Sequence, residues 1–309
     1  MKYYLITLIL LAFLYGCVAD QHLAKTADTK LIEKHLANIA KTNGFRNYKN
    51  PQLLNSIASY IFNNFLLYCD TVYFQEYTVE TTTYKNVIGI INKAKQEKIV
   101  VGAHYDVAGD QEGADDNASG VVGLLELARL LNQQELNYQI ELVAYSLEEP
   151  PFFRTEHMGS YIHAKDLHDN KIDIKGMICL EMIGYFSEES GSQDYPLPHK
   201  KLIYGEKGNY ILIVQKFADG SFGNDIKRYM KHADFIETKS VKLSSAVPGI
   251  DFSDHLNYWK FGYNAIMVTN TSFYRNKNYH QATDKMETLD IDKMSSVINE
   301  VFIAIKSME

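Results

Sequence analysis

The sequence is poor in cysteine and has no surplus of basic residues. Only three cysteines occur among its 309 residues, and the formal net charge at pH 7 is −7. So few cysteines do not form a disulfide framework. Because nucleic-acid-binding proteins carry a basic surface, the acidic balance predicts no nucleic-acid partner.

Two hydrolase motifs are also missing. No G-x-S-x-G pattern occurs, which argues against a serine nucleophile held on a strand-to-helix turn. No H-E-x-x-H pattern occurs, which argues against a zinc site with two histidines on one helix. Internal repeats and long low-complexity linkers are lacking too, so nothing in the sequence divides the chain into separate domains.

The N-terminus carries the pattern of an export signal. Lys2 precedes an apolar run at residues 5–14, which is too short to span a bilayer comfortably and is typical of a signal peptide. The "LYGC" that follows resembles a bacterial lipobox, in which Cys17 would carry the lipid. We therefore predict a lipoprotein signal peptide over residues 1–16 and a tether over residues 17–30. A plain signal peptide and an uncleaved anchor are the alternatives.

The predicted lipid on Cys17 would hold the exported protein at a bacterial membrane. Val18 follows that cysteine and gives no inner-membrane retention signal. We therefore expect a location in the periplasm or at the outer membrane. The sequence leaves the oligomeric state open.

Beyond residue 30, strand and helix patterns alternate along the chain. Apolar or alternating runs predict strands at residues 72–78, 86–91, 99–104, 140–146, 176–183, 210–215 and 264–270. Helical periodicity marks residues 29–43, 52–67, 118–131, 221–234 and 290–308. This alternation predicts one α/β domain over residues 31–309, a three-layer α/β/α sandwich around a mostly parallel, mixed sheet.

Histidine and carboxylate side chains follow the ends of the buried strands. His104, the pair Glu148 and Glu149, and Glu181 each stand at or just after such a run, and Asp116 opens the next helix. In open α/β sheets, ligands bind outside the carboxyl ends of the strands. Clustered carboxylates repel one another, and a divalent metal would remove that penalty. Histidine and carboxylate ligands without a thiolate suit catalytic zinc.

Each of these residues also has an ordinary structural interpretation. His104 could be a hydrogen-bonded core histidine, and Asp116 could cap the helix that it opens. Glu148 and Glu149 could form a solvated loop pair. Metal ligation explains the set better, because a free glutamate at position 181 inside a core strand would be costly.

Six segments in order resemble the co-catalytic zinc aminopeptidases. They are "GAHYD", "GADDNASGVVGLLELARLL", "YSLEEP", "LEMIGY", "FSDH" and "YHQATD". This exopeptidase family includes secreted bacterial leucine aminopeptidases, glutamate carboxypeptidase II and the glutaminyl cyclases. The resemblance covers roughly residues 30–309 and implies two zinc ions per chain.

The resemblance also implies the metal ligands. Asp116 would bridge the two zinc ions. Glu149 and His280 would complete one site, and His104 and Glu181 would complete the other. His280 depends most on the resemblance, because the polar segment around it could be any loop.

Three further residues receive roles from the resemblance. Glu148 would be the general base that activates a metal-bridging water. Asp106 would stand behind His104 and orient its imidazole ring. His255 would either donate a hydrogen bond to the developing oxyanion or hold a loop.

The activity implied is hydrolysis of N-terminal residues from peptides. The alternatives are a glutaminyl cyclase-like acyltransferase with one zinc ion, a carboxypeptidase, and a catalytically inactive binding relative. In the segment after Glu149, Arg154 or His157 could meet a substrate carboxylate, as a carboxypeptidase requires. The alternative for this segment is a surface loop with a structural arginine. Phe152 and Phe153 could form the wall of a pocket.

Overall fold

The computed structural model describes residues 26–217, 220–244 and 247–309. The predicted signal peptide, Cys17 and most of the predicted tether lie outside the described residues. Helix α1 (Thr29–Ala40) includes the last two tether residues, because the Asp28 side chain accepts hydrogen bonds from the backbone N–H groups of Lys30 and Leu31. In these three described segments, we find no helix long and apolar enough to cross a membrane.

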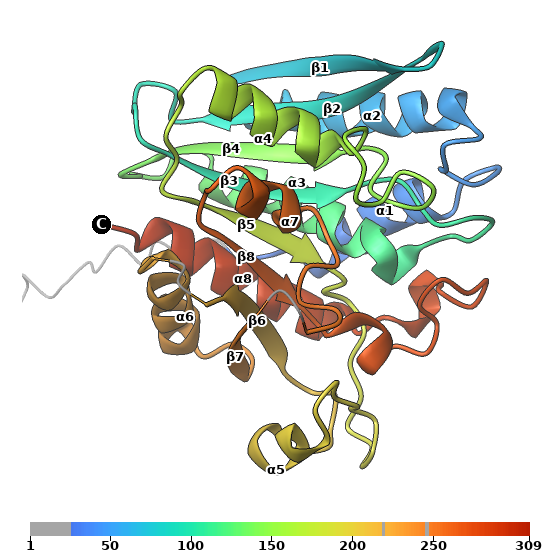
Figure 1. Ribbon diagram of the computed structural model, residues 1–309, viewed down its shortest axis with the longest axis vertical. Coiled ribbons are helices and arrows are strands. Elements are labelled where there is room, and N and C mark those ends of the chain that lie inside the picture. The colour runs from blue at the N-terminus through green and yellow to red at the C-terminus, as the bar shows by residue number, and fades with distance from the viewer. Residues whose placement is uncertain (1–25, 218–219, 245–246) are drawn as a thin grey trace, which may run out of the picture.

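Eight strands in the described part of the chain form one sheet (Figure 1). Their order is β1-β2-β4-β3-β5-β8-β6-β7. The central strands β4, β3, β5 and β8 run parallel, and antiparallel pairings join β1, β2 and β6 to them. The strands are β1 (Thr71–Val79), β2 (Thr82–Ile91), β3 (Lys98–His104), β4 (Gln139–Tyr145), β5 (Gly176–Glu181), β6 (Ile211–Lys216), β7 (Thr238–Leu243) and β8 (Ala265–Thr269).

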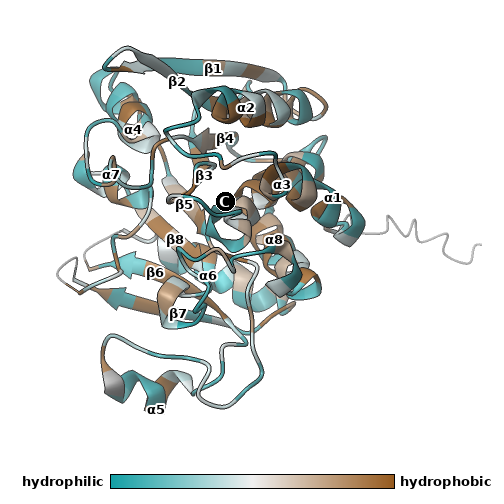
Figure 2. Ribbon diagram, turned by 90° about the vertical axis from the view of Figure 1, so that its right-hand side faces the viewer, coloured by the Kyte–Doolittle hydropathy of each residue, from teal (hydrophilic) through white to brown (hydrophobic). Residues whose placement is uncertain are grey.

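Helices cover both faces of the sheet and make the predicted three layers (Figures 1 and 2). On one side α2 (Pro51–Phe65), α3 (Gly120–Leu131) and α6 (Phe222–Ala233) pack on the strands. On this side α1 and α8 (Ile291–Lys306) pack against those helices. On the other side lie α4 (Gly159–Asp169) and α7 (His255–Lys260). Figure 2 shows the apolar residues gathered in the strands and on the helix sides that face them.

Three elements lack the patterns used to predict the others. Strand β7 lies at the sheet edge and carries Lys239 and Lys242, so it has no continuous apolar run. Helix α4 buries Gly159, Ser160 and His163, which are small or polar. Helix α7 has only six residues, too few for a helical period to be visible. A fourth element without such a pattern is the short helix α5 (Lys201–Tyr204), which belongs to a segment that projects beyond β6 and β7 (Figure 1).

The parallel strands bring distant segments of the chain to one edge of the sheet. The carboxyl ends of β4, β3, β5 and β8 lie side by side there. A close approach at Gly120 draws the start of α3 against the end of β5, since a Cβ at this position would lie 2.5 Å from the carbonyl oxygen of Leu180. The segments that carry the predicted site residues therefore converge at this edge.

Candidate active site

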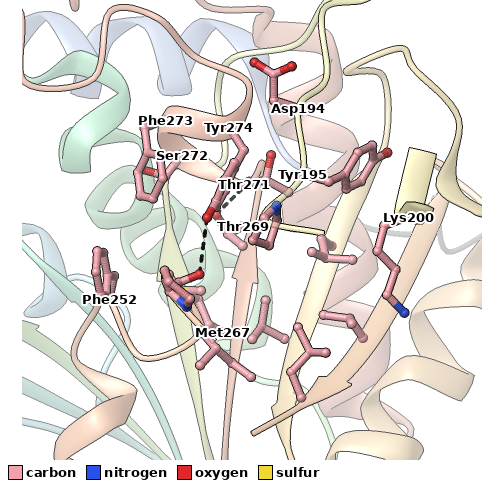
Figure 3. A pocket seen from close by; sticks show the side chains of 18 of the residues that line it. Asp194, Tyr195, Lys200, Phe252, Met267, Thr269, Thr271, Ser272, Phe273 and Tyr274 are labelled. Atoms are coloured by element: carbon pink, nitrogen blue, oxygen red, sulfur yellow. Dashed lines mark hydrogen bonds between the residues drawn. The ribbon is translucent and has the colours of Figure 1, made fainter. Parts of the chain in front are cut away.

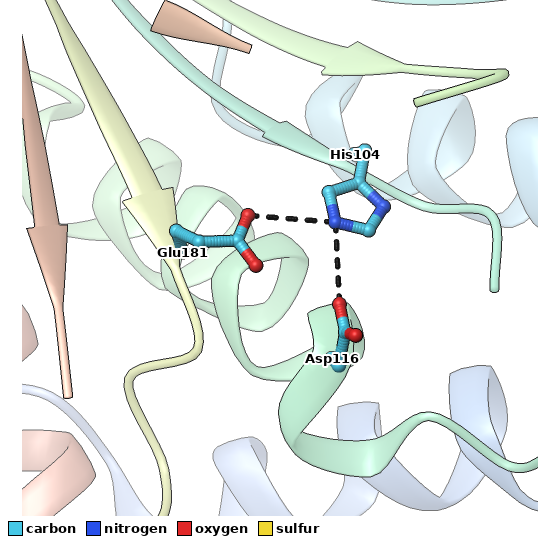
Figure 4. A group of neighbouring side chains, drawn as sticks. All are labelled: His104, Asp116 and Glu181. Carbon is cyan, nitrogen blue, oxygen red and sulfur yellow. Dashed lines mark ion pairs between the residues drawn. The ribbon is translucent and has the colours of Figure 1, made fainter. Parts of the chain in front are cut away.

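His104 lies at the centre of a first group of predicted metal ligands. It ends β3, and its Nε2 lies 3.4 Å from Oδ1 of Asp116 and 3.4 Å from Oε2 of Glu181 (Figure 4). Asp116 comes from the turn before α3, and Glu181 ends β5. All three side chains are buried. The group therefore has the composition predicted for one zinc site.

A second group shares Asp116 with the first. Nε2 of His280 lies 3.2 Å from Oδ2 of Asp116 and 3.2 Å from Oε2 of Glu149. Asp116 thus offers one carboxylate oxygen to each group, as a bridging ligand would. His280 has the most exposed side chain of the five predicted ligands, at 29%, so it stands where the site opens to solvent.

The donor atoms of both groups fit a divalent cation. In each group the candidate ligand atoms lie within 4.8 Å of one another. Oδ2 of Asp116, Oε1 of Glu149 and Nε2 of His280 are buried without a hydrogen-bond partner, which is costly for polar atoms. A cation held by these oxygens and nitrogens would remove that cost, and the mixed ligand set suits zinc.

The electrostatics of the cluster also favour a bound divalent cation. Burial raises the pKa of Glu148 well above its ordinary value and that of Glu149 to about 7. Burial lowers the pKa of His280, but its ion pairs with Asp116 and Glu149 outweigh this and raise it to about 10. A bound cation would take the place of the protons that these shifts favour.

Asp106 supports both the first histidine and the double glutamate. Its Oδ1 accepts a hydrogen bond from the backbone N–H of Glu148 at 3.1 Å, and its Oδ2 accepts one from Glu149 at 3.0 Å. Nδ1 of His104 lies 3.2 Å from the Asp106 carbonyl oxygen and 3.5 Å from Oδ1. Asp106 is thus placed to orient the ring, and it also fixes the backbone of the two glutamates.

Asp284 makes an equivalent contact that the sequence did not predict. The backbone N–H groups of Asp115 and Asp116 donate to its two carboxylate oxygens, each at 3.0 Å. Asp284 is the final residue of the "YHQATD" segment, so the motif contained it without indicating its role. Two aspartates therefore each bind a pair of consecutive backbone amides beside a predicted ligand.

The side chains of three further residues hold the first group in place. Nδ2 of Asn117 donates to the carbonyl oxygen of Leu180 at 2.9 Å and to Oε2 of Glu181 at 3.2 Å. The hydroxyl of Ser253 donates to the same Glu181 oxygen at 2.7 Å. Arg46, also not predicted, is buried and donates to the carbonyl oxygens of Tyr105, at 2.8 Å, and Gly113. Arg46 thereby secures the loop between the first histidine and Asp116.

His255 belongs to neither ligand group and is not among the residues that line the hollow beside them. Its Nε2 contacts the carbonyl oxygen of Ile250 at 2.7 Å, and its ring packs edge-on against Trp259. Burial lowers its pKa to about 4, so the ring is neutral and donates to that carbonyl group. Of the two predicted roles for His255, this geometry corresponds to holding a loop rather than to contacting an oxyanion.

Arg154 and His157 also differ from the carboxypeptidase prediction. A guanidinium nitrogen of Arg154 lies 2.6 Å from Oδ1 of Asp251, so this cation already has an anionic partner. His157 is exposed and packs on Phe152. Neither residue lines the hollow beside the ligand groups.

That hollow is lined by acidic and aromatic side chains. It encloses about 490 Å³, partly open to solvent, and Tyr279, which the sequence did not predict, stacks on His280 in its wall with a centroid distance of 3.8 Å. The lining residues are Asp116, Glu148, Glu149, Pro150, Phe153, Glu181, Phe252, Ser272, Tyr279 and His280. We call this space the acidic hollow.

A second, apolar hollow adjoins the acidic one (Figure 3). Its space of about 790 Å³ is also partly open to solvent. Its floor consists of side chains from β6, β7 and β8, and its roof comes from residues 193–204, 248–252 and 271–274. Glu181, Phe252 and Ser272 line both spaces.

Comparison with known proteins decides the family. The sequence pattern that describes peptidase family M28 matches residues 86–304, well over half of the chain. The chain belongs to peptidase family M28. Membership confirms the predicted zinc-exopeptidase family and the predicted metallopeptidase class.

Two relatives match this M28 protein over different shares of their own length. The uncharacterized protein YfbL of Escherichia coli is 41% identical over 283 residues, which are 89% of this chain and 87% of YfbL. Leucine aminopeptidase 1 of Ajellomyces capsulatus is 27% identical over 224 residues, which are 68% of this chain. The match covers 52% of that aminopeptidase, so the chain spans about half of its length.

Solved structures of M28-like proteins confirm the predicted fold. The LapA aminopeptidase of Legionella pneumophila superposes with a TM-score of 0.71 at 19% identity, covering 92% of this chain and 73% of LapA. A glutaminyl cyclase from Bacteroides thetaiotaomicron superposes with a TM-score of 0.68 at 18% identity, covering 93% of this chain and 100% of the cyclase. At these identities the likeness establishes the fold alone.

The two hydrogen bonds of Asp284 generate a prediction about metal affinity. In Asp284→Asn an amide N–H₂ would replace one acceptor oxygen and face a backbone N–H donor. The turn that carries Asp116 would then loosen, and zinc affinity should fall by about 10- to 100-fold. Competition with a chromophoric chelator measures this. Asp290→Asn is the matched control, because Asn also caps helices well at this N-cap of α8. Equal zinc affinity in Asp284→Asn and Asp290→Asn would contradict the role of Asp284.

Proposed function

We propose that this M28 protein is a zinc-dependent aminopeptidase that removes N-terminal residues from peptides. The observation that supports this is the lining of the acidic hollow, whose described residues include no lysine or arginine. A carboxypeptidase must bind the α-carboxylate of its substrate, for which such a cationic side chain is the usual partner. The described lining offers none, which favours a substrate bound by its N-terminal end.

The two ligand groups support a pair of zinc ions. His104, Asp116 and Glu181 would hold one ion, and Asp116, Glu149 and His280 would hold the other. When bound, such ions would supply Lewis-acid polarisation of the scissile carbonyl and would increase the acidity of the attacking water.

Glu148 is placed to move the proton in this reaction. It lines the acidic hollow, and its Oε2 lies 3.8 Å from Nε2 of His104. Its position is set by the hydrogen bond from its backbone N–H to Asp106. A carboxylate held in this position can take a proton from the attacking water and deliver it to the leaving amine.

Tyr279 is the better candidate for the oxyanion contact that the sequence analysis considered for His255. Its side chain lines the acidic hollow, whereas that of His255 does not. Stacking on His280 fixes the orientation of the Tyr279 ring. Its phenol group can therefore donate a hydrogen bond to the developing negative charge.

The apolar hollow would take the side chain of the N-terminal residue. It adjoins the predicted ligand Glu181, and Val214, Met267 and Phe273 are among its walls. An apolar N-terminal residue would remove this surface from water. The name of the fungal relatives, leucine aminopeptidase 1, agrees with such a preference.

A glutaminyl cyclase is the second candidate, supported by the cyclase of similar fold. The resemblance implies a single zinc ion for the cyclases. Here both three-residue groups are complete, which favours a pair of ions and therefore hydrolysis.

The proposed setting is extracytoplasmic. The signal-peptide pattern and the lipobox at Cys17 support export and attachment to a bacterial membrane through an N-terminal lipid. Peptides in the periplasm or at the outer membrane would then be the substrates.

A substrate panel tests the proposed activity. We expect the zinc-loaded protein to hydrolyse leucyl-, phenylalanyl- and alanyl-p-nitroanilide, and chelation should abolish hydrolysis. N-acetylated dipeptides with a free carboxylate should remain intact, because the described lining of the acidic hollow offers that carboxylate no lysine or arginine. Cleavage of only the N-acetylated set would establish a carboxypeptidase, and cyclisation of N-terminal glutamine alone would establish a cyclase.

Glu148→Gln separates the proton carrier from the metal ligands. The amide retains the shape of the side chain but cannot accept the proton, so kcat should fall by about 10²- to 10⁴-fold. Zinc content should stay at the wild-type value, because the bridging carboxylate of Asp116 and the other predicted ligands remain. Plasma emission spectrometry gives the zinc content and nitroanilide hydrolysis gives kcat. Wild-type turnover in this variant would exclude Glu148 as the base.

A further inference from the structure

Phe252 is the only aromatic residue among the described residues that lines both the acidic and the apolar hollow. Figure 3 shows its ring at one side of the apolar hollow, opposite Lys200. The other two shared lining residues are Glu181, a predicted ligand, and the small Ser272. The ring of Phe252 is therefore the one bulky partition between the acidic hollow, where the reaction would take place, and the apolar hollow, where the substrate side chain would bind.

The Phe252 ring belongs to an arc of aromatic rings along the two hollows. Phe252 packs edge-on against Phe153 at 5.8 Å and tilted against Phe273 at 6.1 Å, measured between ring centroids. Phe273 lies 5.6 Å from Tyr279, which stacks on His280. Three loops thus contribute rings to one continuous wall, and Phe252 stands between the other two loops.

A salt bridge joins the loop that carries Phe252 to the loop that follows β4. Arg154 from the loop after β4 binds Asp251, the neighbour of Phe252, at 2.6 Å. The guanidinium carbon also lies 5.4 Å from the centroid of the Phe153 ring and 5.3 Å from that of Phe252. These contacts fix the spacing of the two loops and the position of the Phe252 ring.

We propose that Phe252 determines which N-terminal side chains the protein accepts and that the Arg154–Asp251 pair positions it. The proposal rests on the aminopeptidase function proposed above. The ring narrows the passage between the hollows and supplies apolar contact to a side chain of moderate size. A larger side chain collides with it. Arg154 is therefore a positioning residue for Phe252, and it is not a receptor for a substrate carboxylate.

Phe252→Ala tests the partition directly. Loss of the ring joins the two hollows, so kcat/KM for tryptophanyl-nitroanilide should rise relative to leucyl-nitroanilide by about tenfold or more. The change should appear mainly in KM, because the ligand groups and Glu148 are untouched. The side chain is 37% exposed in the native fold, so its removal leaves no cavity in the core. Phe235→Ala, at a ring that is 45% exposed and outside both hollows, should not change the ratio.

Substitutions in the ion pair test the positioning role. Arg154→Gln and Asp251→Asn should each shift the same ratio in the same direction by about two- to fivefold, the range of a partly exposed ion pair. The double variant should have the same tryptophanyl-to-leucyl ratio of kcat/KM as the single variants, because the two residues act as one unit. Arg154→Lys should restore most of the wild-type ratio. Lys165→Gln, which removes an exposed ion pair to Asp169 on α4, is the matched control and should have no effect.

Binding of amino alcohols separates this proposal from the proposed function. Leucinol and tryptophanol carry the amine and the side chain but no scissile bond, and calorimetry measures their affinity for the zinc-loaded protein. If the wild type cleaves no aminoacyl-nitroanilide, the aminopeptidase proposal fails, whereas a changed tryptophanol-to-leucinol affinity ratio in Phe252→Ala still supports the partition. An unchanged ratio in Phe252→Ala, in both binding and hydrolysis, overturns the proposal for Phe252. Wild-type ratios in Arg154→Gln and Asp251→Asn overturn the role of the pair.

Discussion

The repulsion between buried carboxylates is the constraint on which this structure depends. Asp116, Glu148, Glu149 and Glu181 lie together at one edge of the sheet, nearly removed from water. Two imidazole rings compensate part of this charge, and protons retained on the glutamates compensate more. Divalent cations would compensate it best, which explains why the chain can bury such a cluster.

The rest of the site keeps these side chains in place when they would otherwise move apart. Asp106 and Asp284 use the same device, in which both oxygens of one carboxylate accept hydrogen bonds from consecutive backbone amides. Each thereby fixes a loop that carries a predicted ligand. The parallel strands form a rigid frame, and the hydrogen bonds of these two aspartates hold the loops in place beside it.

Features that follow from local pattern were predictable, and features that follow from loop paths were not. The sandwich and its sheet followed from apolar runs and helical periodicity, and the strand-end position of His104 and Glu181 followed from the same runs. The pairing of Arg154 with Asp251 depends on how two distant loops meet, which no periodicity reveals. The burial of His255 likewise depends on where α7 packs, and the contact of Asp284 depends on the backbone course near Asp116.

The position of bound zinc tests the central claim most directly, namely that Asp116 joins two metal sites. Crystals of the zinc-loaded protein, measured at the zinc absorption edge, should show two anomalous peaks with the Asp116 carboxylate between them. One peak should contact His104 and Glu181, and the other should contact Glu149 and His280. A single peak, or peaks that Asp116 does not contact, would contradict the account.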